Sequence, residues 1–293
     1  MPRRPKIILI TGATTGIGRD TALWLAREGH RVFATGRKAG LLEKLKQEAA
    51  GTSLEALILD VCDPVSIAAA REEVDRRTQG HGLDVLVNNA GFGLVAPMEL
   101  ISAQDVRALF DTNVFGLLNT TQAFLPRMRE RGAGLIINLS SIVGRLTIPF
   151  MGTYCATKHA VEALSDALRM EGRPCGVRVC LVEPGTLRTQ FDTTATSVEA
   201  KYFPPDSPYA QAIQTYQRTF ARVYRASPGP QCVARLISRI VSSRRPRARY
   251  LVPRYNALLL FGARISLTWI VDAITCRLTG LTRKNFPPAP ARK

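Results

Sequence analysis

The stretch Lys6-Ile7-Ile8-Leu9-Ile10-Thr11-Gly12-Ala13-Thr14-Thr15-Gly16-Ile17-Gly18 joins a short apolar run to a glycine-rich turn. The apolar run is long enough for a buried strand and too short to cross a membrane. Apolar residues then recur at helical spacing over 20–28. Glycines at a strand-to-helix turn let a pyrophosphate approach the backbone N–H groups at the helix N-terminus. The stretch therefore predicts a dinucleotide-binding fold, although its spacing is Gly-x-x-x-Gly-x-Gly rather than the commoner Gly-x-Gly-x-x-Gly.

The end of the second predicted strand indicates which dinucleotide is bound. A site selective for NAD usually places a carboxylate there, on the ribose 2′-hydroxyl. This chain has Gly36 at that point, followed by Arg37 and Lys38. A small residue leaves room for a 2′-phosphate, and an arginine can bind it through two hydrogen bonds. We therefore expect NADP(H), while the alternative is that the two cations merely solvate the start of the next helix.

The pair Tyr154 and Lys158 lies in the run 153–158, which is predicted to be helical. Side chains four residues apart lie on one face of a helix, so a phenol would sit beside a cation. A nearby ammonium favours the phenolate, and we expect it to lower the tyrosine pKa and make the hydroxyl a usable proton donor and acceptor. Alone, such a pair also fits a solvated helix face, but the glycine-rich turn favours catalysis.

Strand and helix patterns alternate along the 293 residues. We expect strands near 6–11, 31–35, 54–60, 83–88, 134–140, 177–183 and 248–252. This alternation predicts an α/β fold, a Rossmann-type doubly wound parallel sheet with helices on both faces. The length suits one dinucleotide-binding and catalytic domain, residues 1–253, followed by a basic and apolar C-terminal helical extension, residues 254–293.

Seven motifs in order resemble those of the short-chain dehydrogenase/reductase family, over about 6–253. They are Thr11-Gly12 with Gly16-Ile17-Gly18; Asp60-Val61; Asn88-Asn89-Ala90-Gly91; Thr112-Asn113-Val114-Phe115-Gly116; Asn138-Leu139-Ser140-Ser141; Tyr154 with Lys158; and Glu183-Pro184-Gly185 with Thr189. The stretch 134–168 resembles the branch that holds 17β-hydroxysteroid and retinol dehydrogenases.

The resemblance implies a catalytic set of Asn113, Ser141, Tyr154 and Lys158, in which Asn113 holds a water of the proton relay. Ser141 lies thirteen residues before Tyr154, as the family's serine does, so it is favoured over its neighbour Ser140. Together, the glycine-rich turn, the second strand and the resemblance imply a set of cofactor contacts. These are Gly12, Thr14, Thr15, Gly16, Ile17, Gly18, Arg37, Asp60, Val61, Asn88, Ala90, Gly91, Tyr154, Lys158, Pro184, Gly185 and Thr189.

These residues predict an NADP(H)-dependent oxidoreductase that transfers a hydride between nicotinamide and a lipophilic alcohol or carbonyl compound, such as a steroid, retinoid or fatty aldehyde. The lipophilic substrate rests on the branch resemblance and on the apolar C-terminal segment. The alternative is a catalytically idle protein that senses NADP(H) and regulates a partner at a membrane or nucleic acid.

Most of the net charge of +17 lies near the C-terminus. Residues 207–293 hold sixteen Lys or Arg and one acid, Asp272, whereas residues 1–206 are nearly neutral. A helical stretch over 256–279 carries a polar stripe and a wide apolar face. A basic apolar helix of this kind indicates peripheral contact with an anionic membrane. Its alternatives are a helix that caps the substrate cleft or packs on a second subunit. No nucleic-acid-binding motif accompanies the charge, so we expect no nucleic acid partner.

The remaining features point to a metal-free protein of the cytoplasm. Three isolated histidines have no Cys or carboxylate at ligand spacing, so no metal is expected, and six cysteines without a Cys-x-x-Cys pair suggest reduced thiols. The basic N-terminal residues precede a strand and do not form a signal peptide. Alanines recur along one face of the helix at 154–168, either packing on the domain's own sheet or forming a homodimer or homotetramer interface, as is common in the family.

Overall fold

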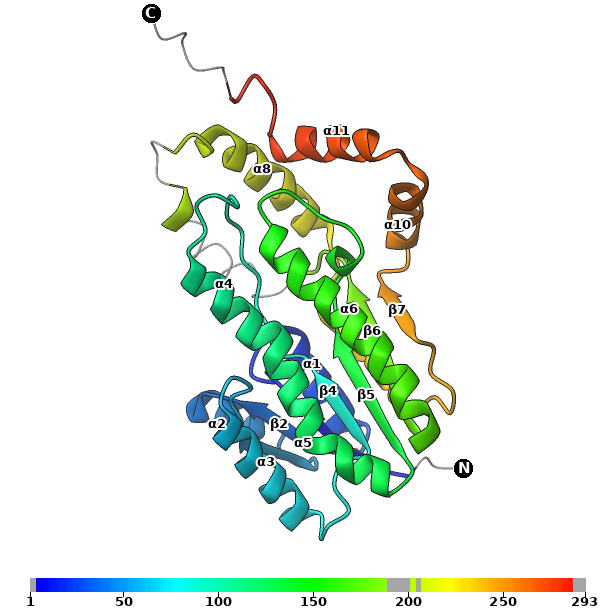
Figure 1. Cartoon of the computed structure of the whole chain (residues 1–293). Coiled ribbons are helices and arrows are strands. Elements are labelled where there is room, and N and C mark those ends of the chain that lie inside the picture. Colours follow the sequence, from blue (N-terminus) through cyan, green and yellow to red (C-terminus); the bar gives the residue numbers. More distant parts are fainter. Residues whose placement is uncertain (1–3, 189–200, 204–206, 287–293) are drawn as a thin grey trace, which may run out of the picture.

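The computed structural model describes residues 4–188, 201–203 and 207–286. Within them seven strands form one sheet, in the order β3-β2-β1-β4-β5-β6-β7, and every neighbouring pair is parallel (Figure 1). The strands are β1 (Ile7–Ile10), β2 (Arg31–Gly36), β3 (Leu54–Ile58), β4 (Val85–Asn88), β5 (Gly134–Leu139), β6 (Val177–Pro184) and β7 (Arg249–Val252). The predicted fold class is confirmed, and each predicted strand end lies within two residues of the observed one. The strand order reverses between β1 and β4, so a ligand site is expected at the carboxyl ends of these strands.

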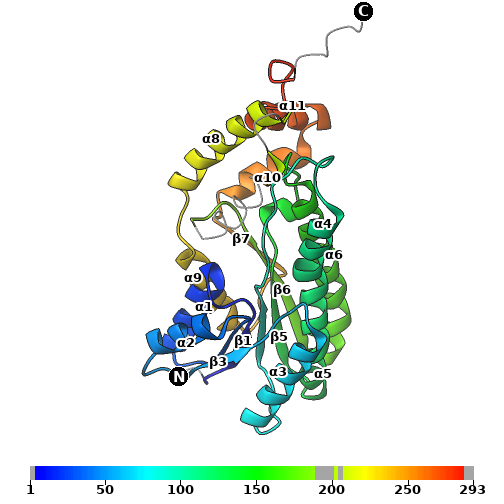
Figure 2. The ribbon, with the colours of Figure 1, turned by 90° about the vertical axis from the view of Figure 1, so that its left-hand side faces the viewer.

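Helices cover both faces of the sheet (Figure 2). On one face lie α1 (Gly16–Arg27), α2 (Ala39–Glu48) and α9 (Gln231–Val241). On the other face lie α3 (Pro64–Arg77), α5 (Gly116–Glu130) and α6 (Gly152–Gly172). The short helix α4 (Ala103–Phe110) runs into α5 through a π-helical turn, Asp111–Phe115. The sheet is thus buried on both sides, which explains why its central strands are continuously apolar.

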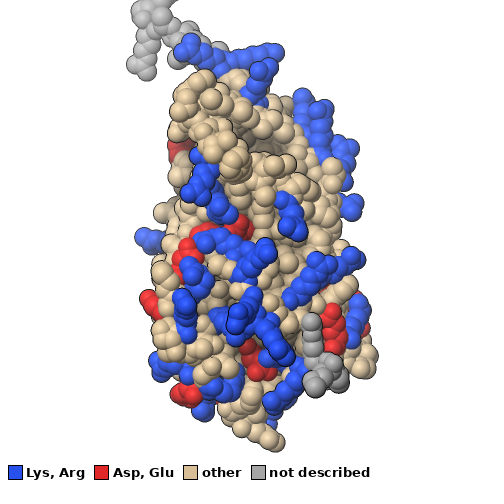
Figure 3. All heavy atoms as spheres, turned by 90° about the vertical axis from the view of Figure 1, so that its right-hand side faces the viewer, with Lys and Arg blue, Asp and Glu red and all other residues tan. Residues whose placement is uncertain are grey.

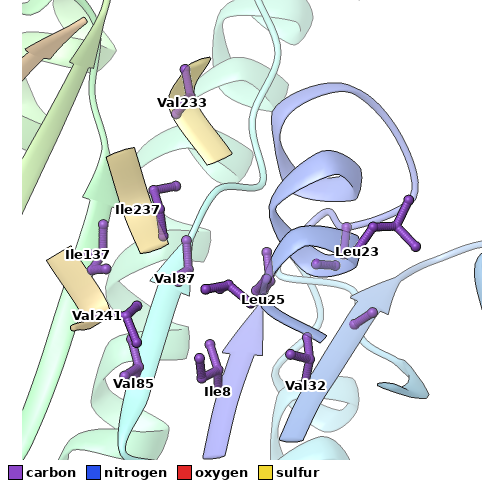
Figure 4. Close-up of a cluster of buried hydrophobic side chains, with 14 of the residues drawn as sticks. Ile8, Leu23, Leu25, Val32, Val85, Val87, Ile137, Val233, Ile237 and Val241 are labelled. Carbon is purple, nitrogen blue, oxygen red and sulfur yellow. The ribbon is translucent and has the colours of Figure 1, made fainter. Parts of the chain in front are cut away.

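The larger core cluster lies between the sheet and the α1–α9 pair (Figure 4). Ile8, Val85 and Val87 of the central strands meet Leu25 of α1 and Ile237 of α9, and all five side chains are at most 1% exposed. Burial of one such side chain contributes roughly 1.5–3 kcal/mol. This packing holds the carboxyl end of β1, and with it the glycine-rich turn, in one position.

Capping residues explain where two helices on the other face begin. Asp63 precedes α3, and its carboxylate accepts a hydrogen bond from the N–H of Val65, while Pro64 occupies the first helical position. Ser102 precedes α4, and its hydroxyl accepts from the N–H of Asp105. Each cap satisfies a helix N–H group that has no partner inside its own helix.

The C-terminal part consists of α8 (Ala210–Ala226), α10 (Asn256–Ile265) and α11 (Thr268–Thr279) beyond the carboxyl ends of the strands (Figure 1). The prediction of one helical stretch over 256–279 was wrong. Ser266 and Leu267 are extended, with ψ of 148° and 140°, and break the stretch in two. The break turns α11 so that it packs along α8. No helix among the described residues is both long and apolar enough to span a bilayer.

Candidate active site

The glycine-rich turn leaves β1 and enters α1 at the strand-order reversal. Gly12 and Gly16 have φ of +63° and +55°, in the left-handed region that favours glycine. Gly18 has no space for a side chain, because an added Cβ would lie 2.4 Å from Nδ2 of Asn89 and 2.5 Å from the carbonyl oxygen of Gly12. Bare backbone therefore faces the cleft at the N-terminus of α1, where the helix dipole favours an anion. The predicted residues Thr14, Thr15 and Ile17 line the same cleft.

Two residues that the sequence analysis did not single out hold this turn against β4. Asn89 donates from Nδ2 to the carbonyl oxygens of Thr11 and Gly12, at 2.9 and 3.0 Å. The hydroxyl of Thr11 accepts from the N–H groups of Asn89 and Ala90, at 2.9 and 3.0 Å. Thr11 and Asn89 belong to two different sequence motifs, and only the tertiary structure reveals that these motifs are hydrogen-bonded to each other.

Asn88 was predicted to contact the cofactor, but it does not line the cleft. Its amide nitrogen donates to the side chains of Thr121 and Asn138, at 2.9 Å each, beneath the cleft. The cleft itself is lined by Asn89, Ala90 and Gly91. Because successive side chains of a strand point to opposite faces, the asparagine after the strand reaches the cleft while Asn88 remains in the core.

The cleft continues past Asp60 and Val61 to the end of β2. An added Cβ at Gly36 would lie 2.8 Å from the methyl carbon of Thr14, so a larger residue would need that side chain to move. Arg37 is 70% exposed, and its Nη1 lies 3.9 Å from Oδ2 of Asp60. This guanidinium is therefore held only loosely, at the edge of the cleft.

Ser141 and Tyr154 meet at the end of β5. The Ser141 hydroxyl donates to the carbonyl oxygen of Pro184 at 3.3 Å and is hydrogen-bonded to the hydroxyl of Tyr154. Both residues line the cleft, and Tyr154 is 7% exposed. Ser140 also lines the cleft, but its hydroxyl is buried close to Gly144. Of the two serines, Ser141 is the one that contacts Tyr154.

Lys158 lies one turn along α6 from Tyr154, but its ammonium is not at the tyrosine hydroxyl. Nζ donates to the carbonyl oxygen of Leu139 at 2.8 Å and lies 5.8 Å from the centre of the Tyr154 ring. Burial lowers the Lys158 pKa to about 8, against the opposing charge of Glu162. Burial raises the Tyr154 pKa, and the hydrogen bond between the Tyr154 and Ser141 hydroxyls opposes this rise. The expectation that the lysine lowers the tyrosine pKa was therefore wrong for the protein alone, because desolvation by burial has the largest effect on this hydroxyl.

Asn113 lies at the centre of the π-helical turn and is 1% exposed. Its amide oxygen accepts from the N–H of Phe92 at 3.0 Å, and its nitrogen donates to the carbonyl oxygen of Phe92 and to the hydroxyl of Thr157, at 2.9 and 3.1 Å. The side chain thus ties the π turn to α6 and to the segment after β4. Such turns often occur at functional sites, and this one places the side-chain amide of Asn113 beside Gly91, where the ammonium of Lys158 also lies nearby.

Pro184 and Gly185 form the last wall of the cofactor side of the cleft. Thr189, which was expected beside them, lies outside the described residues. Together the described walls enclose a cleft of about 930 Å³. Its lining changes from polar at the glycine-rich turn to apolar near Phe92, Ile148 and Phe220.

A buried ionic cluster supports the cleft from behind, and the sequence analysis missed it. Arg249 of β7 binds Glu162 at 3.0 Å, Asp166 at 2.6 Å and Glu183 at 3.3 Å. Arg145 binds the other oxygen of Glu183 at 3.3 Å. Burial, with the charge of Glu162, raises the Glu183 pKa. The cluster joins α6, which carries Tyr154 and Lys158, to the strand that ends at Pro184.

Known proteins resemble this chain in sequence and fold. A family model described as short chain dehydrogenase matches residues 6–200. The chain belongs to the short-chain dehydrogenase/reductase family. A 3-ketodihydrosphingosine reductase of Bacteroides thetaiotaomicron is 37% identical over 246 residues, covering 84% of this chain and 87% of that protein. Human 17-beta-hydroxysteroid dehydrogenase type 1 is 36% identical, with coverage of 83% and 76%. Bovine retinol dehydrogenase 8 is 34% identical, with coverage of 90% and 86%. The predicted resemblance to the steroid and retinol branch is confirmed.

Solved structures of this family agree with the fold. A short-chain dehydrogenase/reductase of Burkholderia phymatum in complex with NAD has a TM-score of 0.77 and 26% identity, covering 89% of this chain and 93% of the other. An alcohol dehydrogenase of Thermococcus sibiricus complexed with 5-hydroxy-NADP has a TM-score of 0.69 and 26% identity, covering 85% and 96%. The protein is thus an oxidoreductase of a family that binds nicotinamide dinucleotides. Among the described residues, no three His, Cys, Asp or Glu side chains converge as metal ligands would.

Proposed function

We propose that the protein is an NADP(H)-dependent oxidoreductase that interconverts a lipophilic alcohol and its carbonyl compound. The observation that carries the proposal is the hydrogen-bonded pair of Ser141 and Tyr154, beside buried Lys158, where the polar part of the cleft meets its apolar part. A proton donor at that junction stands between a site for a dinucleotide and a site for an apolar molecule. The residues fit such a cofactor, because glycines 12, 16 and 18 leave bare backbone at a helix N-terminus.

The nicotinamide, when bound, supplies or accepts the hydride. In the reductive direction, the Ser141 hydroxyl donates a hydrogen bond to the substrate's carbonyl oxygen, where negative charge develops. Tyr154 gives its proton to the same oxygen. Lys158 stabilises the resulting phenolate electrostatically, and a proton from solvent restores the hydroxyl through a water relay at Lys158 and Asn113. The raised Tyr154 pKa keeps the hydroxyl protonated at neutral pH, which suits a proton donor.

Replacing Tyr154 with Phe tests this mechanism. The variant keeps the ring and loses the proton, so turnover should fall by about a thousandfold or more while cofactor affinity stays within a factor of about two. Tyr250→Phe, which removes a hydroxyl bonded to the N–H of Arg247, is the matched control and should keep full activity. Unchanged turnover in Tyr154→Phe would refute the assignment, and a biological effect that persists without turnover would favour the sensing alternative.

The preference for NADP(H) rests on the end of β2. Gly36 is packed against Thr14 and offers no carboxylate, while Arg37 is exposed at the cleft edge with one long contact to Asp60. That guanidinium is available to a 2′-phosphate. NADPH should bind more tightly than NADH, and Arg37→Ala should remove most of the difference without weakening NADH. Arg27→Ala, at the far end of α1, is the control, and equal affinities in the unmodified protein would refute the preference.

The substrate class follows from the apolar end of the cleft. It is lined by Phe92, Ile148 and Met151 and by Tyr216 and Phe220 of α8. Relatives named for a ketodihydrosphingosine, a hydroxysteroid and retinol support a lipophilic substrate. A panel of long-chain ketones and aldehydes, steroids, retinoids and small polar carbonyl compounds, scored by NADPH absorbance, tests the class. A preference for the small polar compounds would refute it.

We also propose that α6 forms a subunit interface of a homodimer or homotetramer. Its alanines do not pack on the sheet: Ala156 and Ala163 are exposed, and Ala160 and Ala167 are half-buried. Light scattering after gel filtration should give a multiple of 32.1 kDa, which Ala163→Glu should reduce. Finally, we propose that the protein works in the cytoplasm at a membrane surface, because its positive charge is concentrated at the C-terminal end.

A further inference from the structure

The outer side of α10 and α11 exposes an unusual amount of apolar surface. Nine of the sixteen large apolar residues that are exposed among the described residues lie between 255 and 278. They include Leu258, Phe261, Ile265, Leu267, Trp269 and Ile274, which are 57–78% exposed. We call the surface formed by these six residues the apical face. A contiguous apolar surface of this kind marks an interaction site more often than chance exposure.

The inner side of α11 and the residues after it pack closely against the rest of the protein. The exposure of the apical face is therefore not the result of poor packing of this segment. An added Cβ at Gly280, just after α11, would lie 2.7 Å from Cβ of Thr215 on α8. Phe286 stacks edge-on against Tyr209, with ring centres 5.2 Å apart. Thr279 is 1% exposed, and its hydroxyl donates to the carbonyl oxygen of Thr275 at 2.9 Å. The buried side of α11 therefore includes Thr279, while Trp269, Ile274 and Leu278 of the same helix are exposed.

Positive charge borders the apical face. Arg254, Arg264 and Arg277 are exposed on or beside α10 and α11, and Arg283 and Lys284 follow. The single acid in this region is Asp272. Figure 3 shows a largely uncharged upper region with Lys and Arg around its edges. A second copy of the chain on this face would bring like charges together, whereas an anionic lipid surface would complement both the charge and the apolar side chains.

The apical face lies next to the apolar end of the cleft. Tyr216, Phe220 and Tyr224 of α8 line the cleft, and α11 packs along α8 (Figure 2). At the start of α10, the amide of Asn256 lies against Gly185, so that an added Cβ there would approach its nitrogen to 2.0 Å. The helices that carry the apical face thus contact both the substrate end and the cofactor end of the cleft.

We propose that the apical face lies flat on an anionic bilayer and that the cleft takes its lipophilic substrate from that bilayer. The proposal rests on the lipophilic substrate and the membrane surface proposed above, and it names the surface that makes the contact. The apolar side chains enter the region between headgroups and acyl chains, and the bordering arginines bind lipid phosphates. The opening of the cleft then lies near the bilayer, where a lipophilic substrate is concentrated.

Vesicle binding by the full chain tests the contact. The probes are vesicles of phosphatidylcholine and phosphatidylglycerol in equal parts, with pure phosphatidylcholine for comparison. The protein should bind the anionic vesicles, and high salt should weaken the binding. The chain has two tryptophans, so the fluorescence of Trp269 should shift to the blue on binding. The shift should be lost in Trp269→Phe and kept in Trp24→Phe.

Matched pairs of variants identify the face. Leu258→Asp with Phe261→Asp should reduce vesicle binding by about tenfold or more. Val65→Asp with Ala69→Asp makes the same change in net charge at two exposed positions of α3, and it should bind as the unmodified protein does. Arg264→Glu with Arg277→Glu should remove the preference for anionic vesicles, whereas Arg107→Glu with Arg239→Glu, with the same change in net charge, should reduce it less.

Each outcome decides the proposal. Failure of the unmodified protein to bind anionic vesicles, or equal binding by both aspartate pairs, would overturn it. A dimer that becomes a monomer in Leu258→Asp with Phe261→Asp would instead assign the face to a second copy of the chain. Turnover of a water-soluble carbonyl compound should be the same in all these variants. Loss of vesicle binding with that turnover intact separates this proposal from a failure of the proposed enzyme activity.

Discussion

The sheet with its flanking helices buries its apolar side chains, whereas the C-terminal pair α10–α11 leaves many of them exposed. Strands β1 and β4 bury Ile8, Ile10 and Val87 completely, against α1 and α9. The pair α10–α11 leaves Leu258 and Trp269 at 78% and 67% exposure. Charge does not separate the two regions in the same way, because nine of the sixteen Lys and Arg residues after position 206 lie in 207–253, which include α8, α9 and β7. The first region packs these side chains within the chain, whereas the exposed apolar residues of the second are the ones that we propose to contact a membrane.

The difference shows that apolar pattern alone does not say what an element packs against. An apolar run between glycine-rich turns has a sheet to join, so its partner lies within the chain. The apolar surface of α10 and α11 has no such partner among the described residues, and its nature follows only from the bordering charge. Substitutions at four positions compare the two regions. Their expected effects on cofactor affinity or on the free energy of unfolding become smaller from the first to the last.

A methyl group at Gly18 should have the largest effect. In Gly18→Ala the new Cβ would meet Nδ2 of Asn89 and the carbonyl oxygen of Gly12, which cannot both move without breaking the hydrogen bonds that hold the turn. NADPH affinity should fall by about a hundredfold or more, measured by titration calorimetry. Gly40→Ala in α2, where nothing lies within 4 Å, is the control. A loss of less than threefold in Gly18→Ala would mean that this turn is not the phosphate site.

Removal of Arg249 should destabilise the sheet region. Arg249→Met leaves Glu162, Asp166 and Glu183 facing each other without their shared cation. Because the guanidinium is about one-third exposed, we expect the low end of the cost of breaking a buried ion pair, roughly 3 kcal/mol in the free energy of unfolding by urea. Arg254→Met, exposed at the start of the C-terminal region, should change it by less than about 0.5 kcal/mol. Equal effects would contradict the contrast between the regions.

Lys158 should make the stability of the cofactor-free protein depend on pH. Its pKa in the folded protein, about 8, lies below the ordinary lysine value, so folding favours the neutral form. The stability that this provides is complete above the unfolded value, near pH 10.4, and is lost as the pH falls through 8. From pH 7.5 to 9.5, Lys158 should increase the free energy of unfolding by roughly 2 kcal/mol. The contribution is measured as the difference between the unmodified protein and Lys158→Met at each pH. Lys46→Met changes an exposed residue and should show the same pH dependence of stability as the unmodified protein. If the stability difference between the unmodified protein and Lys158→Met did not change with pH, the assigned burial of Lys158 would be contradicted.

A methyl group at Gly262 should have the smallest effect and the opposite sign. Gly262 lies inside α10, and an added Cβ would meet nothing within 4 Å. Gly262→Ala should therefore raise the stability by up to about 1 kcal/mol in thermal unfolding, because alanine loses less backbone entropy in a helix. Cofactor affinity should not change. Destabilisation would show that α10 packs against a surface that its exposure does not reveal.

Prediction from the sequence worked best where local signals agreed. The run Ile7–Ile10, the glycines after it and the helical spacing of 20–28 all require one local structure, so β1, the turn and α1 were predictable. Tyr154 and Lys158 were correctly placed on one helix. The tyrosine pKa was not predictable, because desolvation depends on every segment that covers the ring. Ser266 and Leu267 carry no Gly or Pro signal, so the break between α10 and α11 was missed.

By itself, the sequence determined the parallel α/β fold and the position of the glycine-rich turn, because strand period, helix period and glycine placement act over a few neighbouring residues. Only the tertiary structure decided that Asn89 rather than Asn88 faces the cleft, that Arg249 contacts three carboxylates, and that Trp269, Ile274 and Leu278 are exposed on α11. Each of these depends on contacts between residues far apart in the chain, whose geometry no local pattern encodes.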